Sequence, residues 1–288
     1  MTVSSQISEL AVVTGTSTGI GAATARELAR RGFHVLAGVR RDRDADAIRG
    51  PGIEPIILDV TNREHIATLV SRIRTDPEGR FLRALVNNAA VQANIPIEAF
   101  PIDEWRQMFE VNLFGQVAVT QALLPDLIAG RGRVVNISSV GGKVAMASYG
   151  PYAATKFALE AVSDSLRREI SAYGVHVVVV EPGAVRTEML GRAIDTADAL
   201  VSAMTPEQRH RYGPLVLAVN DQAISSTKSG LPAEAAASVI AKAITARKPR
   251  TRYTVGREAA LLTLVRFLPD RLLDYVLATA LRPHYPKQ

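Results

Sequence analysis

Short apolar segments alternate with longer segments of helical periodicity along most of the chain. The short segments are continuously apolar, which is typical of strands buried on both faces of a parallel sheet. Strands are expected at residues 10–14, 34–38, 53–58, 84–86, 133–137, 175–180 and 252–255. Helices are expected at residues 21–31, 105–128, 152–172 and 232–246. Strand–helix–strand units with right-handed crossovers predict an α/β fold built on a Rossmann-type, doubly wound parallel sheet.

Two regions depart from this alternation of strands and helices. Residues 186–230 contain only short helical patches, and tracts of this length inside a compact domain are usually lids or binding loops. Residues 257–281 look helical around a break at Pro269. Because no repeat or linker interrupts the 288 residues, we expect a single domain over residues 1–288. Its substrate lid lies at about 186–230 and its C-terminal helical extension at about 257–288.

The composition narrows the classes of function. Apolar residues make up 47% and charged residues 22%, as in ordinary globular proteins. The absence of cysteine excludes disulfides, thiolate metal sites and cysteine nucleophiles, and the five histidines have no paired ligand spacing, so we expect no metal. The net charge of +6 comes from arginines spread along the chain, which favours a solvated surface over a nucleic-acid interface.

The start of the chain lacks the pattern of a signal peptide, and no stretch looks apolar for long enough to cross a bilayer. We therefore expect a cytoplasmic protein.

A glycine-rich turn, TGTSTGIG from Thr14 to Gly21, joins the first expected strand to the first helix. Glycines in such a turn allow a tight bend and a close approach to a pyrophosphate, and the helix N-terminus offers N–H groups and a positive dipole end. Steric needs alone also produce glycine-rich turns, but this position in a βαβ unit favours dinucleotide binding. The expected contacts are Gly15, Ser17, Thr18, Gly19, Ile20 and Gly21.

The end of the second strand indicates which dinucleotide is used. An acidic residue there would hold a ribose 2′-hydroxyl, whereas an arginine suits a 2′-phosphate. This chain has Arg40 and Arg41 and no carboxylate at the strand end. NADP(H) is therefore favoured, with NAD(H) as the alternative if both arginines are surface charges paired with Asp42, Asp44 or Asp46.

Tyr152 and Lys156 are one turn apart and share a face of the helix that begins near Pro151. An ammonium and a positive helix end both lower the pKa of a phenol, which would let Tyr152 exchange a proton with a substrate oxygen near neutral pH. Taken alone, the pair also fits a buried tyrosine above a surface lysine.

From about Leu10 to Thr187 these motifs, in this order, resemble the short-chain dehydrogenase/reductase family in its compact, single-domain form. Asp59-Val60, the Asn87-Asn88-Ala89-Ala90 run and the segment from Pro182 to Thr187 match family motifs, although Ala90 replaces a glycine. The resemblance implies cofactor contacts at Asp59, Val60, Asn88, Ala89, Ala90, Tyr152, Lys156, Pro182, Gly183, Val185 and Thr187.

The resemblance also implies a catalytic set of Asn112, Ser139, Tyr152 and Lys156. Ser139 would hydrogen-bond the substrate oxygen, Tyr152 would act as general acid or base, and Lys156 would lower the pKa of Tyr152 and bind the nicotinamide ribose. Asn112 would support a proton-relay water. The implied reaction is hydride transfer between NADP(H) and a ketone or secondary alcohol.

The residues after Thr187 and the C-terminal tail are rich in apolar side chains. They favour a small lipophilic substrate, and the length of the lid and tail is similar to the steroid-, retinoid- and hydroxybutyrate-dehydrogenase-like branches; simple core packing is the alternative. For the tail we favour docking or a subunit contact over a membrane surface. The family implies a homodimer or homotetramer.

Two other functions are weighed against this one. A non-catalytic dinucleotide-binding regulator on the same fold would not need Ser139, Tyr152 and Lys156 together. An extended nucleotide-sugar epimerase or dehydratase would need a larger substrate domain than 288 residues accommodate.

Overall fold

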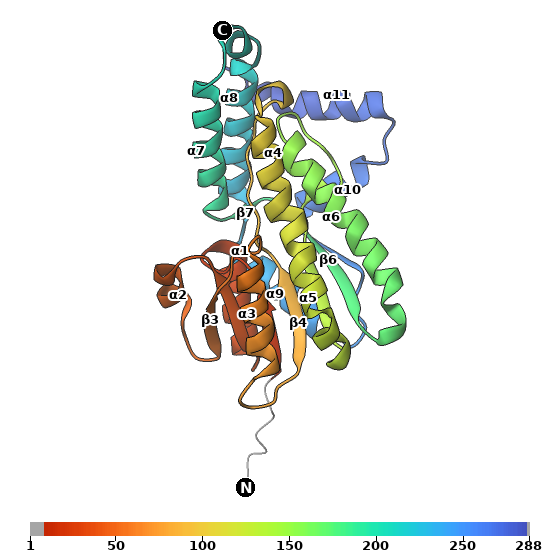
Figure 1. Ribbon diagram of the computed structural model, residues 1–288. Coiled ribbons are helices and arrows are strands. Elements are labelled where there is room, and N and C mark those ends of the chain that lie inside the picture. Colours follow the sequence, from red (N-terminus) through yellow and green to blue (C-terminus); the bar gives the residue numbers. More distant parts are fainter. Residues whose placement is uncertain (1–8, 287–288) are drawn as a thin grey trace.

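The computed structural model describes residues 9–286, and a seven-stranded parallel sheet forms its centre (Figure 1). The strand order is β3-β2-β1-β4-β5-β6-β9, so the order reverses between β1 and β4. The strands are β1 (Leu10–Val13), β2 (His34–Val39), β3 (Ile53–Ile57), β4 (Leu82–Asn87), β5 (Arg133–Ile137), β6 (His176–Pro182) and β9 (Arg252–Val255). This confirms the predicted doubly wound sheet.

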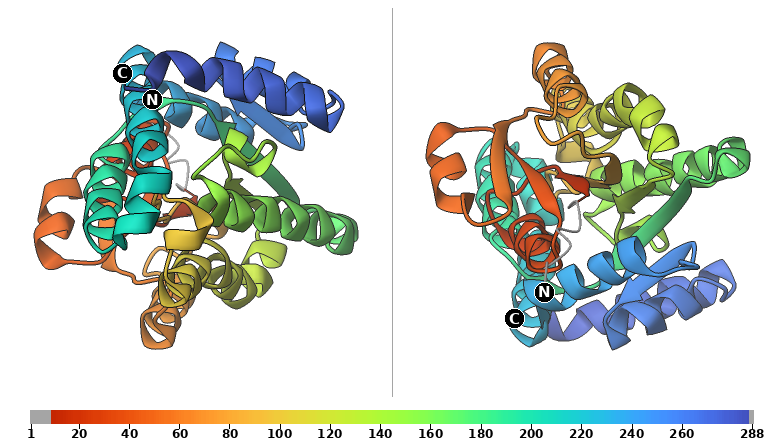
Figure 2. Two further views of the ribbon diagram at one scale, coloured as in Figure 1. Left: turned by 90° about the horizontal axis from the view of Figure 1, so that it is seen from above. Right: turned by 90° about the horizontal axis from the view of Figure 1, so that it is seen from below.

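The strands are continuously apolar because helices cover both faces of the sheet. In β1, Ala11 and Val13 belong to the core on one face, whereas Leu10 and Val12 belong to the core on the other. The first core packs against α1 (Gly19–Arg30) and α9 (Ala233–Thr245). The second core packs against α3 (Arg63–Arg74), α5 (Gly115–Ala129) and α6 (Gly150–Glu169), as the views along the sheet in Figure 2 make visible.

Two helices that the sequence analysis did not identify complete the layers. They are α2 (Asp42–Ile48) and α3, which begins after Asn62. The Asn62 side chain accepts hydrogen bonds from the backbone N–H groups of Glu64 and His65, which is a strong N-terminal cap. Both helices are rich in charge, so their short apolar stripes are hard to recognise.

The predicted helix at 105–128 consists of α4 (Ile102–Phe109), a π-helical turn (Glu110–Phe114) and α5. Together they form a run from Ile102 to Ala129 that is long and apolar enough to cross a membrane, a run that we did not expect. Core helices of soluble proteins meet the same criterion, and half of the most apolar window of this run is buried inside the protein.

The expectation of only short helical patches at residues 186–230 is wrong. This tract forms α7 (Met189–Ser202) and α8 (Pro206–Ser229), which lie side by side above the carboxyl ends of the strands (Figure 1). Thr205 begins α8 with a capping box to Gln208, and Pro206 fits its first turn. Pro214 lies inside α8, although a proline normally suggests a break. Short strands β7 (Val185–Arg186) and β8 (Leu231–Pro232) pair at the base of the two helices.

The C-terminal extension forms α10 (Arg257–Val265) and α11 (Asp270–Leu281), with the predicted break at Pro269. Within residues 9–286, Ala259 is the one buried residue of α10 and Leu281 the one buried residue of α11. Leu281 packs against Ala218 and Val219 of α8, and most of α11 projects from the body as an arm (Figure 2).

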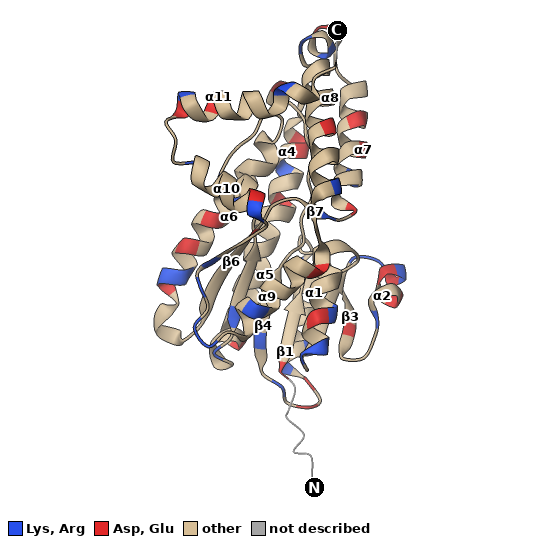
Figure 3. Ribbon diagram, turned by 180° about the vertical axis from the view of Figure 1, so that it is seen from behind, with Lys and Arg blue, Asp and Glu red and all other residues tan. Residues whose placement is uncertain are grey.

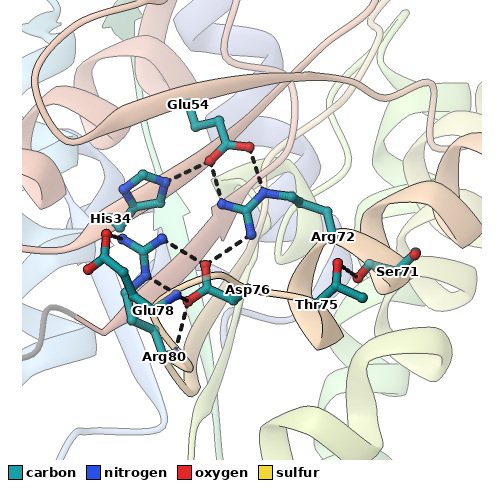
Figure 4. A network of polar contacts seen from close by, with 8 residues as sticks. All are labelled: His34, Glu54, Ser71, Arg72, Thr75, Asp76, Glu78 and Arg80. Atoms are coloured by element: carbon teal, nitrogen blue, oxygen red, sulfur yellow. Dashed lines mark hydrogen bonds and ion pairs between the residues drawn. The ribbon is translucent and has the colours of Figure 1, made fainter.

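Positively and negatively charged residues are mixed along α1, α2 and α6 (Figure 3). At the amino ends of the strands a network joins β2, β3, α3 and the following loop (Figure 4). Its innermost carboxylate, Asp76, lies 2.7 Å from Arg80 and 2.9 Å from Arg72. Arg72 also contacts Glu54, which contacts His34. The network therefore lies at the end of the sheet that is opposite the site described next.

Candidate active site

A cavity of about 1210 Å³ lies where the carboxyl ends of β1, β4, β5 and β6 meet. This is the point at which the strand order reverses, and ligands of open α/β sheets bind at such points. One end of the cavity lies at the glycine turn and the end of β2. The other end is closed by α7, α8 and the C-terminal helices.

The glycine turn has the geometry that a pyrophosphate cradle needs. Gly15 and Gly19 have φ values of 68° and 58°, in the left-handed region that disfavours side chains. A Cβ at Gly21 would lie 2.2 Å from the carbonyl oxygen of Gly15, so only glycine fits there. Among residues 9–286, no side chain caps the first turn of α1, whose N-terminus borders the cavity. These residues fit a dinucleotide phosphate.

Asn88 holds the turn in place. Its side-chain amide donates to the carbonyl oxygens of Thr14 and Gly15 at 2.9 and 3.0 Å. The hydroxyl of Thr14 in turn accepts the backbone N–H groups of Asn88 and Ala89, both at 2.9 Å. The end of β4 and the end of β1 are therefore locked together beside the cavity.

Three arginines line the cavity at the end of β2. Arg43 lies 3.7 Å from Asp44. Arg40 and Arg41 are exposed and make no ion pair within the described chain, so the pairing with Asp42, Asp44 or Asp46 that we weighed does not form there. Arg41 and Arg43 were not among the predicted contacts. Their guanidinium groups make this end of the cavity suitable for a phosphate monoester.

Ser139, Tyr152 and Lys156 meet in the middle of the cavity. The Nζ atom of Lys156 lies 5.6 Å from the centre of the Tyr152 ring and donates a hydrogen bond of 2.8 Å to the carbonyl oxygen of Ile137. The Oγ atom of Ser139 accepts the backbone N–H of Gly141 at 3.0 Å. This leaves the Ser139 hydroxyl hydrogen available to another acceptor.

The pKa of Tyr152 departs from the expectation. Burial raises it to about 12, although hydrogen bonding by Ser139 lowers it. Burial also lowers the pKa of Lys156 to about 8, against the raising effect of Glu160. The expected lowering of the phenol pKa does not occur in the protein alone, because burial dominates and the ammonium is directed to Ile137. Tyr152 therefore keeps its proton at neutral pH and can donate it.

Asn112 lies in the π-helical turn and is fully buried. Its side chain exchanges two hydrogen bonds of 2.8 Å with the backbone of Val91 and donates one of 3.1 Å to Thr155. It is the one predicted site residue that does not line the cavity in the described part of the chain. Its proton-relay role stays a prediction.

The other predicted residues all line the cavity. The glycine turn, Arg40, Asp59 and Val60 are at one end; the residues after β4 and β6 and the group around Tyr152 complete the wall. The predicted site residues that line the cavity are Gly15, Ser17, Thr18, Gly19, Ile20, Gly21, Arg40, Asp59, Val60, Asn88, Ala89, Ala90, Ser139, Tyr152, Lys156, Pro182, Gly183, Val185 and Thr187.

The wall on the far side of Tyr152 is largely apolar and was predicted only as a region. Its side chains come from the loop before α6, from α7, α8, α10 and α11, and from the residues that follow α11. Prominent members are Met146, Tyr149, Met189, Leu190, Leu215, Val219, Leu262, Leu277, Leu281 and Tyr285. Helical periodicity around residues 215–223 and 273–281 was the available signal. Residues 9–286 contain no cluster of three or more His, Asp or Glu side chains able to hold a metal ion.

Comparison with known proteins agrees with this geometry. A family model described as short chain dehydrogenase matches residues 9–198. The NADPH-dependent 3-dehydrocapnine reductase of Ornithobacterium rhinotracheale is 36% identical over 275 residues, covering 92% of this chain and 95% of the reductase. Retinol dehydrogenase 16 of Mus musculus is 36% identical over 286 residues, covering 94% and 88% of the two chains.

Among solved structures, a short chain dehydrogenase from Burkholderia cenocepacia in complex with NADP superimposes with a TM-score of 0.73 at 25% identity. The match covers 94% of this chain and 98% of the other. The likeness therefore extends beyond the sheet into the region of α7, α8 and the C-terminal helices.

Proposed function

The chain belongs to the short-chain dehydrogenase family, and from this premise we propose that it interconverts a lipophilic ketone or aldehyde and the corresponding alcohol with NADP(H). The chain is an oxidoreductase that uses NADP(H), with NAD(H) as a further option. The observation that carries the proposal is the continuity of one cavity. It joins the glycine turn and Arg40, the group of Ser139, Tyr152 and Lys156, and an apolar wall.

In this proposal the protein contributes proton transfer and orientation. The Tyr152 phenol, which keeps its proton at neutral pH, donates it to the carbonyl oxygen during reduction and takes it back during oxidation. The Ser139 hydroxyl, whose oxygen accepts the N–H of Gly141, donates its own hydrogen to the same carbonyl oxygen. Lys156 places a positive charge beside the phenol. When bound, the dinucleotide supplies or accepts the hydride.

The cofactor would lie along the first half of the cavity. The glycine turn and the N-terminus of α1 would hold its pyrophosphate, and Arg40 with Arg41 would hold the 2′-phosphate. Pro182, Gly183, Val185 and Thr187 would surround the nicotinamide end. Asp59 and Val60 would contact adenine.

The substrate class rests on the apolar wall and on the relatives. A reductase named for 3-dehydrocapnine and a dehydrogenase named for retinol both match over nearly the whole chain. Leucine, valine and methionine side chains from α7, α8 and α11 would surround a lipophilic substrate and exclude water from the reacting carbonyl. Retinoids and ketosteroids are the compounds that this wall favours.

Assembly and location are also part of the proposal. We propose a homodimer or homotetramer that pairs through the two long helices, supported by the exposed side chains of Ile102 on α4, Phe114 in the π-helical turn and Phe157 on α6. The exposed arm α11 favours a subunit contact rather than a membrane surface. A cytoplasmic protein is supported by the packing of the Ile102–Ala129 run against the core. Residues 1–288 would act as one domain, because the lid and the extension line the same cavity as the sheet.

The test is NADPH oxidation at 340 nm by the purified chain with all-trans-retinaldehyde, a 17-ketosteroid and, for comparison, an aldose and a 2-oxo acid. We expect turnover with the lipophilic carbonyls only. Tight NADPH binding without turnover on any carbonyl would support the non-catalytic regulator instead. Preference for the aldose would contradict the assignment of the apolar wall.

A further inference from the structure

A cluster of four charged side chains lies behind the Ser139 turn, outside the cavity. Lys143 follows the turn Val140–Gly142 (η3), and its Nζ atom lies 2.6 Å from Glu160 and 3.2 Å from Glu181. Arg252 approaches the same two carboxylates at 3.0 and 3.4 Å. We call Lys143, Glu160, Glu181 and Arg252 the rear charge cluster.

Three of the four side chains are buried and Arg252 is partly exposed, so the cluster is not a set of surface ion pairs. The side chains of Lys143, Glu160 and Glu181 are 7%, 8% and 2% exposed. Buried ion pairs contribute little net stability compared with apolar packing, and in some proteins they serve to fix one arrangement. Within residues 9–286, the Oε1 atom of Glu160 has no hydrogen-bond partner, and the Oε1 atom of Glu181 meets Lys143 and Arg252 only as ion pairs. Specific placement explains such a cluster better than stability does.

Each anchored segment carries part of the proposed active site. Lys143 ends the turn that begins at Ser139. Glu160 lies on α6 one turn beyond Lys156, and Glu181 directly precedes Pro182 in β6. The ammonium of Lys143 therefore ties the turn that carries Ser139 to the helix of Tyr152 and Lys156 and to the strand that ends beside the cavity.

The turn packs on α6 with little free space. A Cβ at Gly142 would lie 3.2 Å from the carbonyl oxygen of Lys156 and 3.3 Å from Cγ of Glu160. A Cβ at Gly141 would lie 3.5 Å from both the Ser139 Oγ atom and the Tyr152 ring. A small movement of the turn would therefore change how the Ser139 hydroxyl meets the substrate oxygen.

We propose that Lys143 is a positioning residue. Its ion pairs with Glu160 and Glu181 hold the Ser139 side chain in its place beside Tyr152. This inference rests on the proposed function, because it assumes that Ser139 and Tyr152 act on one carbonyl oxygen. Lys143 does not touch the cavity in the described chain and acts only through the turn.

The cluster also affects the charge at the catalytic helix. Glu160 raises the pKa of Lys156. The groups that face this region are Tyr152, Glu160 and Asp164 from α6, Lys143 from the turn, Glu181 from β6 and Arg252 from β9. Removing a negative charge here favours the deprotonated form of Lys156 or Tyr152, and removing a positive charge favours the protonated form. In a plot of kcat against pH, the fall at high pH should therefore shift in opposite directions in Glu160→Gln and Lys143→Met.

The experiment compares Lys143→Met, Lys143→Arg and Glu160→Gln with the exposed control Lys248→Met, using NADPH and all-trans-retinaldehyde. Because a misplacement of about 1 Å can cost about 100-fold in rate, Lys143→Met should lower kcat by roughly 10- to 100-fold. Its Kd for NADPH, measured by fluorescence, should stay within about threefold, and Lys143→Arg, which retains the positive charge between the two carboxylates, should restore most of kcat. The fall of kcat at high pH should move to lower pH in Glu160→Gln and to higher pH in Lys143→Met.

Unchanged kcat in Lys143→Met, or a fall at high pH that moves in the same direction in both variants, would overturn the proposal. If Lys143→Met does not fold, the double variant Lys143→Met with Glu160→Gln removes both charges, and it should show the same loss of kcat. A crystal structure of the variant provides a readout that is independent of turnover. Displacement of Ser139 from Tyr152 is expected, and an unmoved Ser139 contradicts the inference even if retinaldehyde is not a substrate.

Discussion

Arg40 is the residue on which the choice of cofactor depends. It is exposed at the end of β2 and lines the cavity, where its guanidinium can meet a 2′-phosphate. We predict that Arg40→Asp lowers kcat/KM for NADPH by about 100-fold, because a charge-assisted contact is lost and repulsion is added. The value for NADH should change by less than about threefold. Arg49→Asp, a control that is also exposed and lies outside the cavity, should alter neither value. A wild-type protein that already prefers NADH would refute this assignment of Arg40.

At this scale the sequence predicted polar residues that the structure brings together around one cavity, because motif spacing places them at strand ends. It could not predict the direction of the Asn112 side chain, which depends on a π-helical turn and on the backbone of Val91. The pKa of Tyr152 depends on burial by residues far away in the chain. The rear charge cluster joins four separate segments, so no local pattern indicates it.

Helices α7 and α8 are the elements whose motion should govern substrate entry. Among described residues, α7 buries only Ala193 and Ala197, whereas α8 buries Val216, Val219 and three neighbours. Such limited burial permits local opening. We predict faster hydrogen exchange in residues 189–229 than in β1 or β5 for the protein alone, and slower exchange with NADPH and all-trans-retinol. Full protection before any ligand is added would show that α7 and α8 are ordinary packing elements, and the lipophilic substrate would lose support.

The sheet strands were predictable as elements because burial on both faces leaves them continuously apolar. The pair α7–α8 was missed because Gly213 and Pro214 suggest a break in the middle of α8. Helix α3 was missed because its apolar stripe is narrow, and the cap at Asn62 was its strongest signal. Besides this cap, burial of Ile66, Leu69 and Ile73 against the sheet stabilises α3.

For the whole molecule, the network around Asp76 should set part of the acid stability. Arg80 and Arg72 hold the pKa of the Asp76 carboxyl well below its ordinary value. The stabilisation is therefore complete above the pKa of the unfolded chain, near 4, and is lost as the pH falls below it. Asp76→Asn should lower the free energy of unfolding by about 3 kcal/mol at pH 7, since it leaves Arg80 buried without its partner.

Urea unfolding followed by circular dichroism at pH 7 and pH 3 checks this. The difference between wild type and Asp76→Asn should narrow by about 1.4 kcal/mol per pH unit below pH 4. The matched control Asp103→Asn breaks an exposed pair and should cost less than about 1 kcal/mol. A difference that is equal at both pH values would show that Asp76 acts by packing alone.

The most direct test of the central claim is deuterium transfer from NADPH labelled at both C4 positions to all-trans-retinaldehyde or a 17-ketosteroid. We predict an alcohol that is heavier by one deuterium at the carbinol carbon, read by mass spectrometry. Tyr152→Phe should bind NADPH with unchanged affinity and form no labelled alcohol, because only the transferable proton is missing. An alcohol without deuterium, or equal labelling by Tyr152→Phe, would contradict the account.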